Sequence, residues 1–164
     1  MKKNWWRWVL VVAWMVVIYL FSAQTGEESG QLSGGITRWI VERITPNWHT
    51  LSVSAQREIL VTWRFIVRKG AHMAEFAVLS MMFFYAWSGM RERTRGHRAV
   101  LSAACCFLVA ALDEGHQAFV PARGPSLRDV FFDFAGAVLG ILLLLAVLWI
   151  VRKCTKRKEM HAFS

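Results

Sequence analysis

The stretch "DEGHQAFVPARGPSLRD", residues 113–129, decides the fold, because it separates two of the most apolar runs in the sequence. The run before it is too short to cross a bilayer alone, since a spanning helix needs about 20 mainly apolar residues. That helix reaches the required length only if it continues through Asp113 towards Gln117. Residues 121–125 include two prolines and a glycine, which turn the chain before a new helix starts near Ser126. We therefore expect the stretch to join two membrane helices at the boundary of the bilayer.

The composition outside this stretch is that of a small integral membrane protein. Of the 164 residues, 55% are hydrophobic, with nine tryptophans and eleven phenylalanines, yet the formal net charge is +9. The basic residues flank apolar runs instead of covering a soluble core, which argues against a nucleic-acid-binding protein. The three cysteines form no disulfide framework and are interpreted as free thiols. One membrane domain covering residues 1–164 accounts for this length.

Four apolar runs are predicted to be transmembrane helices. The first is interpreted as a retained anchor and not a cleaved signal peptide, because Phe21 stands where a cleavage site needs a small residue. The predicted fold is an all-α integral membrane four-helix bundle, with amphipathic interfacial helices in the connector between the first and second spans. The spans are expected at about residues 5–22, 71–89, 99–117 and 130–151.

The outward connector, residues 24–69, contains two amphipathic runs. In "SGGITRWIVERITP", residues 33–46, apolar residues recur at helical spacing until the proline. This pattern is typical of a helix lying at the membrane interface. A second run, "SAQREILVTWRFIVRK" at residues 54–69, has an apolar side and leads directly into the second predicted span.

The fourth predicted span carries a packing motif. The segment "GAVLG", residues 136–140, places two glycines four residues apart, on one face of a helix. Small residues at this spacing let two membrane helices approach closely. We expect the fourth helix to approach a neighbour through this face.

The distribution of Lys and Arg predicts the orientation in the cell membrane. Twelve of the 20 basic residues lie in segments 1–7, 91–98 and 152–164, which are short loops or tails. Such segments remain on the cytoplasmic side. We therefore expect a multi-pass protein with both termini in the cytoplasm and residues 113–129 facing outward.

Polar residues from several predicted helices should meet at this outer boundary. Arg64, Arg68, His72 and Glu75 are spaced to form one stripe if their helix continues through Gly70. The outer ends of the third and fourth spans add a second set of acidic, amide and basic side chains, namely Asp113, Glu114, Gln117, Arg123, Ser126, Asp129 and Asp133.

Two of these acids lie inside predicted spans. Glu75 and Asp133 are each about one turn beyond the boundary, where an unpaired charge costs at least ~2.5 kcal/mol. Each should therefore face the other helices and find a partner there. The possible partners are Arg68, Arg123 and Arg128.

The ordered set of motifs resembles the VanZ-like membrane proteins. The matching segments are "FSAQ" at 21–24, "RKGAHMAEF" at 68–76, "DEGHQAFVPARGPSLRD" at 113–129 and "DFAGAVLG" at 133–140. Two positions depart from the family pattern: Phe76 replaces a frequent Tyr, and Asp133 replaces a frequent Asn. The resemblance implies the membrane architecture and a site formed by Arg68, His72, Glu75, Asp113, Glu114, Gln117, Arg123, Ser126 and Asp129.

The first functional hypothesis is a binding module for an anionic amphiphile. The expected partner is a membrane lipid or a lipid-linked small molecule, such as a lipid-linked cell-wall precursor or a lipoglycopeptide. The family is named after a protein linked to low-level teicoplanin resistance in Gram-positive bacteria, so a contribution to glycopeptide resistance is an expectation from the resemblance alone. Arginine forks suit phosphate or carboxylate. The expected ligand-binding residues are Arg68, Gln117, Arg123, Ser126, Asp129 and Asp133.

The alternatives are a membrane-embedded enzyme and a structural partner in a membrane assembly. A hydrolase or transferase acting on a lipid-linked substrate could use His72, Glu75, Asp113 and Glu114 for acid–base or metal-assisted chemistry. The sequence contains no recognised zinc-protease, serine-hydrolase or phosphate-loop motif. No metal ligands, cofactor or oligomeric state are assigned, and nucleic acid is not an expected partner.

Overall fold

The computed structural model describes residues 4–89 and 94–162, with side chains up to Lys156. The prediction of an all-α fold is confirmed. A short 3-10 helix, Trp48–Thr50, lies between the second and third helices. Five α-helices are present within the described residues: α1 (Trp6–Ser22), α2 (Gly26–Ile44), α3 (Val53–Trp87), α4 (Arg95–Gln117) and α5 (Leu127–Ala162).

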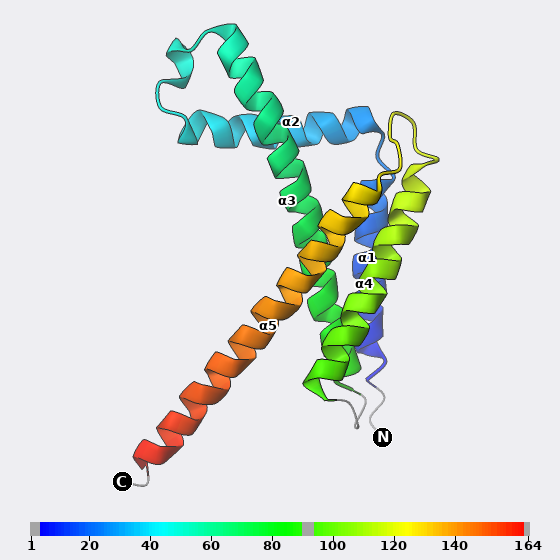
Figure 1. Cartoon of the computed structure of the whole chain (residues 1–164), viewed down its shortest axis with the longest axis vertical. Coiled ribbons are helices and arrows are strands. Elements are labelled where there is room, and N and C mark those ends of the chain that lie inside the picture. Colours follow the sequence, from blue (N-terminus) through cyan, green and yellow to red (C-terminus); the bar gives the residue numbers. More distant parts are fainter. Residues whose placement is uncertain (1–3, 90–93, 163–164) are drawn as a thin grey trace.

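Four helical segments form the body of the molecule. As Figure 1 shows, α1, the second half of α3, α4 and the first half of α5 run side by side, while α2 crosses above them. The chain bends by 100° between α1 and α2. The beginning of α1 and the end of α5 lie towards the same end of the molecule (Figure 1). Segments 114–126 and 23–30 therefore meet at the other end.

A capping box starts α2 immediately after this bend. The hydroxyl of Thr25 accepts a hydrogen bond from the Glu28 backbone N–H at 3.2 Å, and the Glu28 carboxylate accepts the Thr25 backbone N–H at 2.9 Å. These bonds satisfy donors that the first turn would otherwise leave without partners. The bend is thus encoded locally, and α2 contains the predicted interfacial run.

The second amphipathic run and the predicted second span form one continuous helix. Ser52 caps the start of α3 by accepting the Ala55 N–H at 3.3 Å, and the helix continues for 35 residues through Gly70. The condition for the predicted polar stripe is therefore met. The other boundaries differ modestly: α4 starts at Arg95, before the predicted residue 99, and α5 continues well beyond residue 151.

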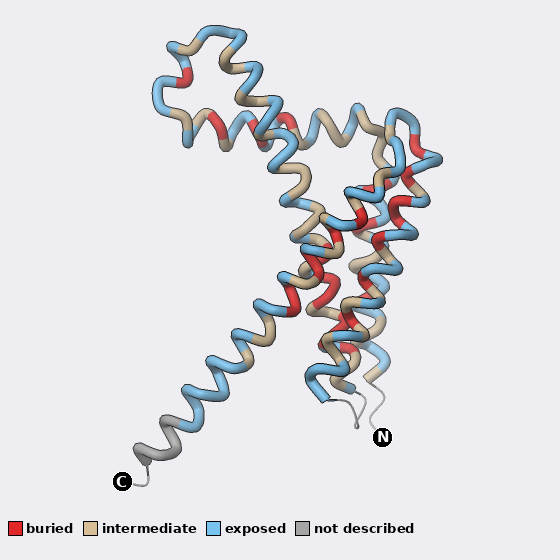
Figure 2. Tube along the Cα trace, in the orientation of Figure 1, coloured by how far each residue is buried: buried red, intermediate tan, exposed pale blue. Residues whose placement is uncertain are grey.

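The buried core lies where the body helices meet. Figure 2 shows buried residues concentrated there, whereas residues 142–156 of α5 are mostly exposed. Phe76 and Leu79 of α3 are fully buried, together with Cys106 of α4 and Ala137 of α5. Cys105 and Cys106 are free thiols, as predicted. The exposed surface of α5 is strongly apolar, which fits a lipid environment.

Close packing of α5 on α3 depends on two glycines. A Cβ added at Gly136 would overlap the Met73 backbone, and one at Gly140 would reach the Ala77 backbone and the Ser80 hydroxyl. The predicted close approach through "GAVLG" is therefore confirmed, with α3 as the neighbour. This contact fixes the polar stripe of α3 relative to the start of α5.

Two to three segments qualify as membrane spans by length and hydropathy. Within the described residues, α4 and the Leu127–Lys156 part of α5 qualify individually, and α1 with α2 qualifies as one bent pair. His72 and Glu75 reduce the hydropathy of the second half of α3, so the span expected at 71–89 stays a prediction. The cytoplasmic location of both termini also stays a prediction, and the basic residues Lys2, Lys3, Arg91 and Arg93 lie outside the described residues.

Candidate functional site

A small cavity lies where the end of α1, the first half of α2 and the middle of α3 meet. Its volume is about 210 Å³. One side is polar and carries Arg68, His72, Glu75 and Arg123. The opposite wall is largely apolar and includes Phe21, Leu32, Ile36, Val67 and Ala71.

The polar side of the small cavity contains several atoms with unused hydrogen-bonding capacity. His72 Nδ1 and Glu75 Oε2 are 3.7 Å apart, which is too long for a hydrogen bond. The buried atoms Glu75 Oε2, Arg68 Nε, Arg123 Nε and Arg123 Nη1 all lack a hydrogen-bond partner among the described residues. Since most buried polar atoms in folded proteins are paired, this concentration distinguishes the cavity from the rest of the molecule.

Arg123 reaches the cavity from the loop between α4 and α5. Its Nη2 donates a hydrogen bond to the Phe21 carbonyl at 3.4 Å. The same loop accepts the Gly26 N–H on the Pro121 carbonyl at 3.3 Å, and Ala122 adopts the left-handed conformation with φ 59°. Burial, followed by the nearby Arg68 charge, lowers the pKa of Arg123. The loop is thus held against both ends of the α1–α2 bend.

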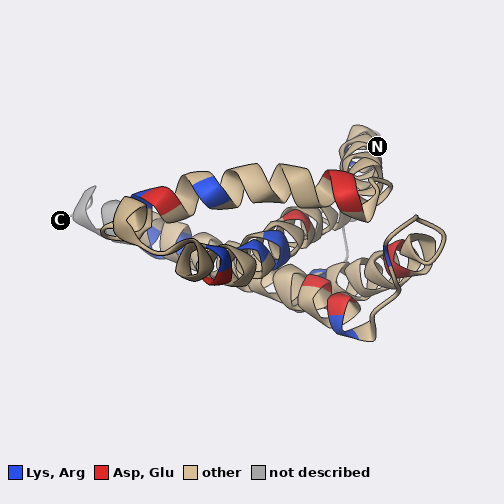
Figure 3. Cartoon of the chain, turned by 90° about the horizontal axis from the view of Figure 1, so that it is seen from above, with Lys and Arg blue, Asp and Glu red and all other residues tan. Residues whose placement is uncertain are grey.

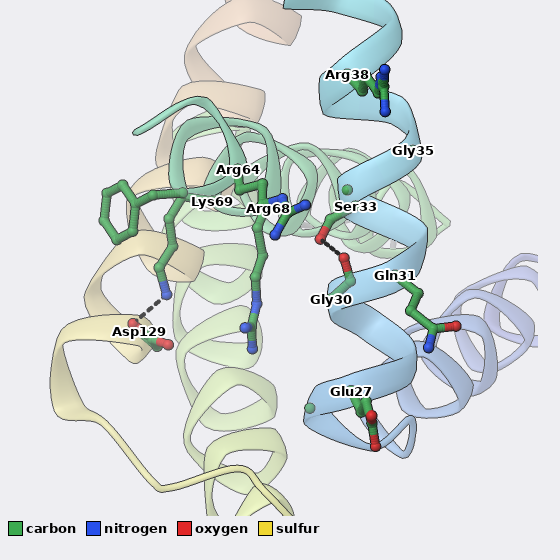
Figure 4. Close-up of a pocket in the computed structure, with 13 residues that line it drawn as sticks. Glu27, Gly30, Gln31, Ser33, Gly35, Arg38, Arg64, Arg68, Lys69 and Asp129 are labelled. Atoms are coloured by element: carbon green, nitrogen blue, oxygen red, sulfur yellow. Dashed lines mark hydrogen bonds and ion pairs between the residues drawn. The ribbon is translucent and has the colours of Figure 1, made fainter. Parts of the chain in front are cut away.

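A large cavity of about 770 Å³ lies between α2 and α3. Figure 4 shows Arg64 and Arg68 between α2 and the pair formed by Lys69 and Asp129. Lys69 Nζ is 2.5 Å from Asp129 Oδ1, so this pair links α3 to α5. The α2 wall is formed mainly by small residues, namely Gly26, Gly30, Ser33, Gly34 and Gly35.

Of the three arginines that line this cavity, Arg64 and Arg68 have no acidic partner. Neither Arg64 nor Arg68 makes a hydrogen bond or an ion pair with another described residue. They are one turn apart on α3, where like charges destabilise a helix by about 0.2–0.5 kcal/mol. In the view from above, the middle of α2 shows no charged residue, and Lys and Arg residues of α3 lie beside it (Figure 3). An anion between the two side chains would remove this repulsion.

A separate polar network joins α4 to α5. Gln117 Nε2 donates to Asp113 Oδ2 at 3.0 Å, and the Ser126 backbone N–H donates to Glu114 Oε1 at 2.5 Å. Asp133 is buried in the same region, with 3% of its surface exposed. The Glu114 bond holds the start of α5 against α4, whereas the Gln117–Asp113 bond lies within α4, one turn apart.

The predicted site residues consequently divide into two groups. Arg68, His72, Glu75 and Arg123 line the small cavity, and Asp129 lines the large one. Asp113, Glu114, Gln117, Ser126 and Asp133 belong to the α4–α5 network and are not among the lining residues of either cavity.

Glu75 and Arg123 both connect the two groups, because Glu75 interacts electrostatically with Asp113, and Arg123 with Asp113 and Glu114. Arg128, which was considered as a partner for Glu75 and Asp133, instead lies over the rings of Phe65 and Phe132. Within the described part of the chain, no cluster of three or more His, Cys, Asp or Glu side chains is placed to hold a metal ion.

Sequence reasoning missed three contributors. The helical spacing predicts Arg64 on the polar stripe of α3, but the predicted site does not include it. The sequence also gives no indication that Lys69 pairs with Asp129. The small-residue wall of α2 was also missed, although Gly26, Gly30 and Gly34 recur every four residues. That spacing, which puts the three on one helical face, was the available signal.

The fold and the similarity to a known family together establish the class of protein. An all-α chain with two to three candidate spans and charged cavities at one end of its packed helices is a membrane protein. The VanZ/LLP1 family model matches residues 7–150, so the chain belongs to this family. No curated protein and no solved structure gives a significant match.

Proposed function

We propose that this protein binds an anionic amphiphile at the membrane boundary. The observation that carries the proposal is the small cavity, in which Arg68 and Arg123 present guanidinium N–H groups without partners opposite an apolar wall. A phosphate or carboxylate between the two forks would accept charge-assisted hydrogen bonds. An attached hydrocarbon chain would cover Phe21, Leu32 and Ile36. Lipid-linked cell-wall precursors and lipoglycopeptides both have this character.

The free-energy cost of unpaired buried guanidinium groups supports the same interpretation. Leaving a charged donor buried and unpaired costs more than the net gain from an ordinary hydrogen bond. A ligand that pairs with Arg123 removes this cost, and the removal of the cost adds to the free energy of binding. A contribution to glycopeptide resistance would follow if the ligand were such an antibiotic or its target.

The proposal includes an orientation. We infer that both termini are cytoplasmic, with α1, the second half of α3, α4 and α5 crossing the membrane. The two cavities then face outward, and α2 lies along the outer surface. In this position Trp39 and Ile36, which are exposed, would rest in the interface.

Binding can be tested with the full chain in nanodiscs of zwitterionic lipid, using farnesyl monophosphate as probe. Arg68→Gln and Arg123→Gln should each weaken binding about tenfold, because each removes one charged hydrogen-bonding partner. Arg57→Gln is the matched control, since Arg57 lies on the same helix, is exposed and lines neither cavity. Unchanged affinity in both cavity variants would refute the proposal.

A second candidate function is hydrolysis or group transfer on a lipid-linked substrate. It is favoured by His72 and Glu75, which face the same cavity as the two arginines and could exchange a proton with bound substrate. Incubation with a lipid-linked precursor, with and without chelator, distinguishes the two functions. Turnover that is lost in Glu75→Gln would establish catalysis, and saturable binding without product would establish the binding module.

A further inference from the structure

The small and large cavities share two lining residues, Arg68 and Ser33. Arg68 therefore stands at the junction, with the apolar-walled space on one side and the basic space on the other. A single ligand could extend from one cavity into the other past this side chain. The two cavities are best considered as one composite site.

Three arginines surround this junction. Arg123 is close enough to Arg68 for the two charges to interact. Arg64 precedes Arg68 by four residues on α3, about 6 Å along the helix axis. A single phosphate between Arg68 and Arg123 would leave Arg64 without a partner. A second anionic group next to the first would use it.

The α2 wall leaves room for this second group. A Cβ at Gly34 would lie 3.3 Å from Arg64 Nη2, so the bare glycine allows the guanidinium to lie against α2. At Gly30 an added Cβ would meet nothing within 4 Å, which shows that the cavity is open there. The α2 wall therefore consists of backbone and open space, and it lies beside the unpaired guanidinium groups of Arg64 and Arg68.

The other two basic residues of the large cavity already have acidic partners. Lys69 is paired with Asp129, and Arg38 is paired with Glu42 at 2.7 Å. Glu27 is the remaining acidic residue of the lining. Recognition of an anion therefore depends on Arg64 and Arg68. The volume of about 770 Å³ falls in the range of sites for whole small molecules, so it can also hold a hydrophilic substituent.

We infer that the composite site recognises a lipid diphosphate that carries a hydrophilic head group. The inference rests on the proposed function and specifies its ligand class. The start of the hydrocarbon chain lies against the apolar wall of the small cavity, the first phosphate binds Arg68 and Arg123, and the second binds Arg68 and Arg64. The substituent beyond the second phosphate fills the space between α2 and α3.

The test compares farnesyl monophosphate, farnesyl diphosphate and inorganic diphosphate on the full chain in zwitterionic nanodiscs. The wild-type protein should bind the lipid diphosphate about tenfold more tightly than the monophosphate, which corresponds to one additional charged interaction. Arg64→Gln should remove this preference, because only the second phosphate uses Arg64. Arg57→Gln should retain it. Inorganic diphosphate should bind far more weakly than the lipid, since it cannot cover the apolar wall.

The outcomes separate this inference from the proposed function. If the monophosphate binds but the wild type shows no preference, or if Arg64→Gln weakens both lipids equally, the diphosphate assignment is wrong while the binding function stands. If inorganic diphosphate binds as tightly as farnesyl diphosphate, the ligand is not a lipid. If no probe binds, both fail. Thermal unfolding of each variant shows whether the exposed Arg64 position affects folding.

Discussion

At the scale of single residues, the charges at this end of the molecule have two different roles. The polar atoms of Glu114 and Gln117 form hydrogen bonds with neighbouring groups of the same chain. Arg123 is held by a backbone carbonyl and keeps two of its nitrogens unpaired. A bond made within the chain stabilises the fold, whereas an unpaired donor in a cavity is available to a ligand. Residues of both kinds look alike in the sequence.

Glu114 should matter for stability. Its carboxylate accepts the Ser126 N–H at the start of α5, and a buried donor left without a partner costs about 1–3 kcal/mol. Glu114→Ala should therefore lower the melting temperature in detergent, as followed by near-ultraviolet circular dichroism. Glu58→Ala is the control, because Glu58 is exposed on α3. Equal melting temperatures in the two variants would show that the cap is dispensable.

At the scale of helices, the sequence was informative where one helix could be judged alone. The extension of α4 to Gln117 followed from an apolar run that was too short, and the stripe on α3 followed from helical spacing. The cavity between α2 and α3 could not be predicted, because its width depends on the 100° bend and on the turn around Trp48. The separation of Gln117 and Asp133 from the arginines also depends on how the helices rotate when they pack.

The contact of α5 with α3 gives a test at this scale. Gly136→Ala should destabilise the protein by about 1–3 kcal/mol, because the added methyl group would overlap the Met73 backbone. Gly70→Ala is the matched control: an added Cβ there meets nothing within 4 Å, and alanine favours a helix interior by up to ~1 kcal/mol. Thermal unfolding of both variants in the same detergent makes the comparison. A Gly136→Ala protein as stable as wild type would contradict the close contact.

At the scale of the whole molecule, the helix directions bear on the proposed orientation. Successive body segments run in opposite directions, so the start of α1 and the end of α5 lie towards the same end, away from both cavities (Figure 1). An arrangement of this kind is compatible with four crossings. Hydropathy and length select fewer segments because His72 and Glu75 lower the hydropathy of the second half of α3, and because α1 alone has 17 residues.

Cysteine labelling in intact cells tests the orientation. Ser126→Cys should react with a membrane-impermeant maleimide and Arg95→Cys should not, because the first is expected outside and the second inside. The background should be Cys154→Ser, since Cys154 is exposed, whereas Cys105 and Cys106 lie within α4. Permeabilised cells, in which both positions should react, provide the control. Labelling at Arg95→Cys but not at Ser126→Cys would invert the orientation.

The unequal lengths of α1 and α5 have a consequence for the surrounding lipid. The 17 residues of α1 extend about 25 Å, whereas the 30-residue span of α5 extends about 45 Å. A hydrocarbon core of about 30 Å is thicker than α1 is long, and a short helix is accommodated by local thinning of the bilayer. In α5 the charged residues at both ends of the span leave an apolar stretch, residues 134–151, that is close to the thickness of the core. We expect the bilayer to be thinnest beside α1. The lipid head groups beside α1 would then lie at the level of Phe21 and Arg123. Local thinning of the bilayer would thus bring amphiphiles close to the small cavity.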